Sequence, residues 1–84
     1  MASPSIGSIG LPSRFAVITP SDTTVYLGGL RSIYVGGAGD VAVMGSDDTV
    51  AVVFFGVPAG SLLVGSFKKV MLTGTTATHL VSGK

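Results

Sequence analysis

The stretch from Leu30 to Phe55 reads LRSIYVGGAGDVAVMGSDDTVAVVFF, and it decides the fold of this 84-residue chain. Three short runs rich in Val, Ile, Tyr and Phe are separated by clusters of Gly, Asp and Ser. Branched and aromatic side chains favour strands, whereas Gly, Asp and Ser favour the turns between them. A helix would need an uninterrupted apolar period of about 3.6 residues, which these clusters break. The stretch therefore predicts short strands and no helix.

The same alternation of apolar runs and turn residues continues on both sides of this stretch, as in sandwiches and barrels. It predicts one all-β domain over residues 14–84, a single small antiparallel β-sandwich or barrel-like fold. Strands are expected near residues 14–19, 25–27, 30–35, 41–44, 49–55, 62–64, 67–73 and 78–81, with turns that include Gly36 to Asp40 and Gly65-Ser66.

Residues 1–13 differ from the rest, because they mix Ser, Gly and Pro with three isolated aliphatic residues, Ile6, Ile9 and Leu11. The segment has neither helical nor strand periodicity. We expect an extended N-terminal arm. It is either a frayed tail or a segment whose three aliphatic side chains dock onto a neighbouring subunit.

The composition predicts self-association. Only 11% of the residues are charged, against roughly 25% in ordinary soluble domains, while 46% are hydrophobic. Val50 to Phe55 is apolar at every position, so one face can meet the core while the other needs a second sheet or a neighbouring subunit. Val52, Phe54 and Phe55, with the three aliphatic residues of the arm, are therefore the candidate contacts to other subunits.

Several partner classes are excluded by the same composition. A net charge of +1, with no basic cluster beyond Lys68-Lys69, argues against nucleic acid. The absence of cysteine excludes disulfides and zinc thiolate sites. There is no apolar run long enough for a membrane helix and no signal-peptide pattern, so we expect a soluble protein without a membrane partner.

The candidate chemical motifs favour structural interpretations. Gly36 to Asp40 could cradle a phosphate, but such a site needs a helix after the glycines, and the run after Asp40 predicts a strand. A hairpin loop is expected instead. His79 is the only histidine and lies in a strand-like run, which predicts a surface or interface residue. Asp47-Asp48 could bind calcium weakly or simply solvate a hairpin tip. We predict no enzyme, no cofactor and no metal site.

Four separated blocks carry a resemblance to a known family. They are FAVITPSD at residues 15–22, RSIYVGGAGDV at 31–41, VPAGSL at 57–62 and LTGTTAT at 72–78. In this order they resemble the small spike-base family of tailed bacteriophages and gene-transfer agents, over roughly Phe15 to Val81. The arm lies outside the match.

The resemblance implies a virion protein on the outer capsid surface, a head spike base or decoration subunit. Its partners would be copies of itself, with a pentamer favoured over a trimer, the major capsid protein, and a spike or fibre protein. The sequence leaves one alternative open, a carbohydrate- or receptor-binding module of a phage fibre or tail. In that case Tyr26, Tyr34 and the Asp-bearing turns would contact a glycan.

Overall fold

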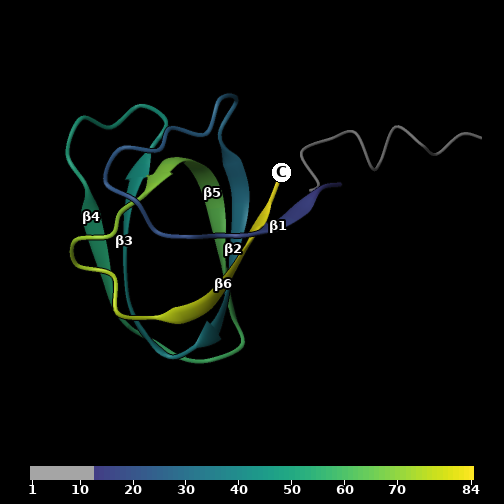
Figure 1. Ribbon diagram of the computed structural model, residues 1–84, viewed down its shortest axis with the longest axis vertical. Coiled ribbons are helices and arrows are strands. Elements are labelled where there is room, and N and C mark those ends of the chain that lie inside the picture. The colour runs from purple at the N-terminus through teal and green to yellow at the C-terminus, as the bar shows by residue number, and fades with distance from the viewer. Residues whose placement is uncertain (1–12) are drawn as a thin grey trace, which may run out of the picture.

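Six antiparallel strands form one sheet in the computed structural model, which describes residues 13–84 (Figure 1). The strands are β1 Phe15–Val17, β2 Leu30–Gly37, β3 Gly39–Gly45, β4 Val52–Val57, β5 Ser61–Val70 and β6 Thr78–Gly83. Their order across the sheet is β1-β6-β2-β5-β3-β4, so β1 and β4 are the two edges. Residues 13–84 contain no helix, and so none that could cross a membrane. The all-β prediction is confirmed.

The sheet curls because β5 pairs with a different strand along each half. Residues 61–67 pair with β2, and residues 67–70 pair with β3. The connection over residues 71–77 then follows the rest of β3, where the Met71 amide donates to the Ala42 carbonyl at 2.8 Å. This connection leads into β6, which pairs with β2 again. Of the two expected architectures, the fold is barrel-like, since all six strands belong to one sheet.

The hydrophobic core fills the inside of this curl. Ile33 and Val35 on β2 are fully buried, while Tyr34 between them is exposed, because successive strand residues point to opposite faces. All six strands except β1 contribute to the core, as do both long connections. Its members are Ile18, Leu30, Ile33, Val35, Val41, Val43, Val57, Phe67, Val70, Ala77 and Leu80.

The strands of the structure differ from the expected ones in several places. The turn expected at Gly65-Ser66 is part of β5, which only bends there, opposite a register shift between Leu30 and Ser32 of β2. Residues 25–27 form no strand and belong to the connection between β1 and β2, although the Tyr26 amide bonds to β5. β4 begins at Val52, three residues later than expected, because the residues before it form the turn.

The glycine-rich segment is a tight connection between strands that are not neighbours. β2 continues through Gly37 and β3 starts at Gly39, so only Ala38 separates them. The expected hairpin is wrong, because β5 lies between β2 and β3 in the sheet. A Cβ atom on Gly37 would overlap the Thr78 hydroxyl oxygen, so glycine allows the close approach to β6. The expectation that a strand follows these glycines is confirmed.

Candidate docking surface

A row of apolar side chains crosses the outer face of four adjacent strands. Val17, Val81, Tyr34 and Leu62 are direct partners in the registers of β1 with β6, β6 with β2, and β2 with β5. Directly paired residues project to the same face, and Tyr34 points away from the core. Val17 is 80% exposed, Leu62 59% and Tyr34 45%, whereas Val81 is half-buried. We call these four residues the outer apolar row.

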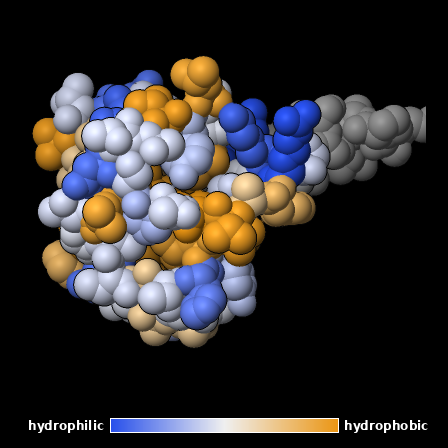
Figure 2. Space-filling model, viewed as in Figure 1, coloured by the Kyte–Doolittle hydropathy of each residue, from blue (hydrophilic) through white to orange (hydrophobic). Residues whose placement is uncertain are grey.

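Two further exposed side chains widen this row. Phe15 and Val64 lie two residues from Val17 and Leu62 on the same strands, and therefore on the same face. Three inter-strand gaps of about 4.8 Å make the row about 14 Å wide. Figure 2 shows apolar groups standing on the visible surface among polar ones. Exposed apolar side chains that adjoin one another in this way make the row a candidate interaction site.

Val52, Phe54 and Phe55, the contact residues predicted on β4, are exposed. Val52 and Phe54 pair directly with Val43 and Val41, which are buried, so they point to the core side of the sheet. Both remain exposed because β4 is an edge strand that packs against only one neighbour. Phe55 is 78% exposed. The structure thus brings these three residues together along one edge of the sheet.

The candidate contacts on the arm, Ile6, Ile9 and Leu11, lie outside the described residues. The first described residue, Ser13, donates its amide hydrogen to the Lys84 carbonyl at 2.9 Å. Arg14 and Lys84 exchange two further backbone bonds of 3.1 and 2.8 Å. The start of β1 is therefore held against the end of β6.

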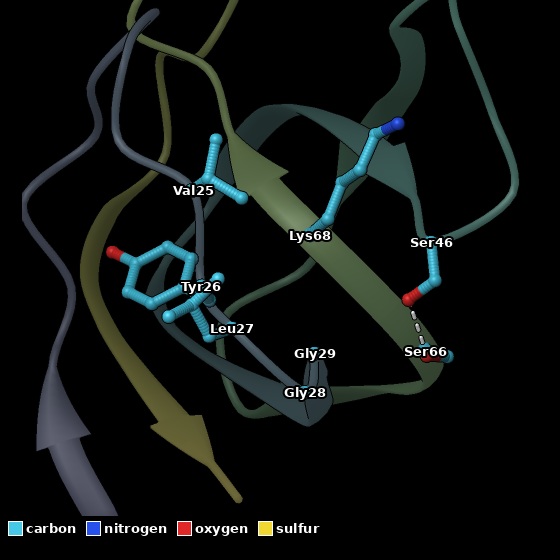
Figure 3. Close-up of a pocket in the computed structure, with 8 residues that line it drawn as sticks. All are labelled: Val25, Tyr26, Leu27, Gly28, Gly29, Ser46, Ser66 and Lys68. Atoms are coloured by element: carbon cyan, nitrogen blue, oxygen red, sulfur yellow. Dashed lines mark hydrogen bonds between the residues drawn. The ribbon is translucent and has the colours of Figure 1, made fainter.

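An open hollow of about 400 Å³ lies between the connection that precedes β2 and the ends of β3 and β5 (Figure 3). Val25, Leu27 and Lys68 line it, and the Ser46 and Ser66 hydroxyls bond to each other at 2.5 Å across its side. Tyr26 also borders the hollow, but it packs against the core. Tyr34 instead belongs to the outer apolar row. The two tyrosines therefore do not form one platform for a sugar ring.

The polar residues singled out from the sequence have structural contacts. Asp22 accepts the Thr73 hydroxyl at 2.6 Å and the Thr73 and Leu72 amides at 2.9 Å each. The Thr73 hydroxyl, above all, lowers the pKa of Asp22 below its ordinary value of 3.8. His79 is exposed, and its Nδ1 lies 3.2 Å from the Thr78 hydroxyl oxygen. Among residues 13–84 no group of three His, Cys, Asp or Glu side chains is placed to hold a metal ion.

The outer apolar row was not found from the sequence. Its members come from four strands that are far apart in the chain, so no local pattern contains them. The alternation of Leu62 with Val64 gave a partial signal, since both flank the buried-side residue Leu63. The missing information was the register, which sets Val17 and Tyr34 on either side of Val81 and places Leu62 next to Tyr34.

No family model and no curated protein matches the sequence. A solved structure does match, one described as the capsid of a native GTA (gene-transfer agent) particle computed with C5 symmetry. One of its chains is 32% identical, with a TM-score of 0.74, and the match covers 87% of this chain and 83% of that one. This chain belongs to the same family as that capsid chain. The family therefore agrees with the sequence resemblance at the level of a gene-transfer-agent capsid.

Proposed function

We propose that this chain is a virion structural protein that binds the outer surface of a phage-like capsid as a homo-oligomer. It serves there as the base of a head spike or as a decoration subunit, and it catalyses no reaction. The observation that carries the proposal is the outer apolar row on a chain of the gene-transfer-agent capsid family. The row would bury its side chains against the major capsid protein.

Attachment through several equal copies fits the weakness of each contact. A single row of four side chains offers too little area for tight binding by one copy, since stable interfaces bury about 800 Å² on each partner. Copies joined in a ring bind a symmetric site with an affinity far above that of one copy. The relative comes from a particle computed with C5 symmetry, which supports a ring of five over a ring of three. A spike or fibre protein would occupy the side of the ring that faces away from the capsid.

The arm supplies a second attachment point in this proposal. Its three isolated aliphatic residues, Ile6, Ile9 and Leu11, would contact the capsid or the next copy. The arm therefore adds apolar contact area beyond the barrel.

Particles that lack this chain provide the test. Purified chain is added to them, and bound copies are counted after sedimentation through a density gradient. We expect saturable binding at a small multiple of five copies for each occupied vertex, and cleavage of bound chain by an added protease that cannot enter the capsid. Chain that is protected inside intact particles, or that does not bind them at all, would refute an outer structural role.

A further inference from the structure

Both flanks of the sheet end in an open strand edge. Arg14 and Lys84 exchange two backbone bonds, so the next residue, Phe15, directs its own amide and carbonyl away from β6. On β3, Ala42 uses its amide and carbonyl to bond Thr75 and Met71. Its partner on β4, Val53, therefore directs its backbone groups away from β3. No described strand pairs with β1 or β4 on these open sides.

Three cations form a row beside the β1 edge. The backbones of Arg14 and Lys84 are hydrogen-bonded. The β2–β6 register ends at Ser32↔Gly83, and one further step of the same register would set Arg31 opposite Lys84. All three side chains are exposed, and none of the four aspartates of the chain stands in this row. Like charges placed directly opposite each other destabilise a sheet. This basic row would therefore gain from an acidic partner.

Two aspartates stand beside the other edge. Asp47 and Asp48 are exposed in the turn between β3 and β4. The Asp48 carboxylate accepts the Gly45 amide hydrogen at an N–O distance of 3.0 Å, which stabilises the turn. The Asp47 carboxylate makes no such hydrogen bond among the described residues. This acidic turn lies next to the start of β4, as the basic row lies next to the start of β1.

The two charged groups lie at the same end of the barrel. Phe67 is the register partner of both Leu30, at the start of β2, and Gly45, at the end of β3. The basic row adjoins the start of β2 and the acidic turn follows the end of β3. Figure 1 places β4 and β1 on opposite sides of the molecule. Each copy therefore has a basic flank and an acidic flank, each with an open edge.

We propose that copies associate head to tail, with the β1 edge and basic row of one copy against the β4 edge and acidic turn of the next. Such a contact uses two different surfaces, and repeated copies form a ring when the rotation from one copy to the next closes, as the proposed function requires. β1 and β4 both start at the charged end of the barrel. If all copies in a ring have this end on the same side, β1 of one copy and β4 of the next run in the same direction where they meet. The inference deepens the proposed function by naming the contact between copies.

Charge reversal in the full chain tests the contact. Arg14→Glu and Asp47→Lys should each raise the dissociation constant of the assembly about tenfold, measured by native mass and sedimentation. The double variant Arg14→Glu/Asp47→Lys should restore assembly, because opposite charges then meet at every junction. Lys69→Glu, a cation outside the basic row, should have no such effect. Equal losses in all three single variants, or no rescue in the double variant, would overturn the proposal.

A backbone test addresses the edge itself. Val53→Pro removes an amide that points to the open side, so it should block the next copy while the β3–β4 bonds remain. Val53→Ala is the matched control and should still assemble. Circular dichroism of the dilute chain checks that both variants fold.

Capsid attachment is measured separately on each variant. Monomeric variants that still bind capsids weakly would support both the contact and the proposed function. A parent chain that stays monomeric at all concentrations but binds capsids would overturn only the head-to-tail contact. A ring that forms as described but never binds capsids would overturn only the proposed function.

Discussion

Truncating Leu62 on the outer apolar row should weaken capsid attachment without destabilising the barrel. Leu62→Ala removes three carbons, each contributing about 0.8 kcal/mol when fully buried. In the free chain 59% of this residue is exposed, so docking can newly bury about that share. The expected loss is about 1.4 kcal/mol for each copy, which is about tenfold in the dissociation constant. In a ring that binds the capsid as one unit, the losses of binding free energy from the individual copies add together.

Leu72→Ala is the matched control for this prediction. Leu72 is the same residue type and is 61% exposed, but it lies on the connection between β5 and β6, away from the row. Binding of each variant to capsids depleted of the chain is measured by quantitative sedimentation, and its melting temperature is measured alone. Equal binding of the two variants would refute the assignment of the row as the docking surface. So would a Leu62→Ala chain whose weaker binding is matched by a lower melting temperature.

Four other outcomes are expected. Thr73→Val should be less stable than the parent at about pH 6, and the difference should vanish as the pH falls through the lowered pKa of Asp22, because only the ionised carboxylate gains from the hydroxyl; urea titrations at several pH values measure this. Gly37→Ala should cost about 1–3 kcal/mol of stability, because its Cβ meets the Thr78 hydroxyl, and Thr78→Gly in the same chain should recover part of that loss. Leu80→Ala should cost about 2–5 kcal/mol in urea unfolding, since this core side chain is 2% exposed, and a smaller cost would contradict a packed interior. Deleting residues 1–12 should leave the melting temperature unchanged, because the core members found among residues 13–84 already fill the inside of the curl, yet weaken binding to capsids; an unfolded product would place the arm in the core.

The class of fold could be predicted from the sequence because its signals are local. Branched residues around Ile33 and Val43 and the glycines between them specify strands and turns without reference to the rest of the chain. The turn expected at Gly65-Ser66 was wrong because the role of these two residues depends on contacts that are distant in the chain. A glycine and a serine suit a turn, but here they let β5 bend while it changes partner from β2 to β3. Only the tertiary pairing distinguishes these two uses.

The candidate surface was predictable only in part. Val52, Phe54 and Phe55 could be selected because residues 50–55 are all apolar, whereas a strand with only one buried face would alternate apolar and polar residues. The outer apolar row combines residues from four strands, and the basic row combines one residue of β2 with residues that flank β1 and β6, so both exist only once the register is known. Arg14, Arg31 and Lys84 are separated widely in the chain and gave no sign of a cluster.

The bend in β5 couples the unfolding of the two halves of the barrel. One continuous segment of ten residues supplies hydrogen-bond partners to both halves of the barrel, β2 on one side and β3 on the other. Neither half can unfold without breaking the hydrogen bonds of β5. Unfolding of one half of the barrel therefore destabilises the other half. The amide hydrogens of β5 should therefore exchange with solvent only through global unfolding, and the barrel should melt as a single cooperative unit.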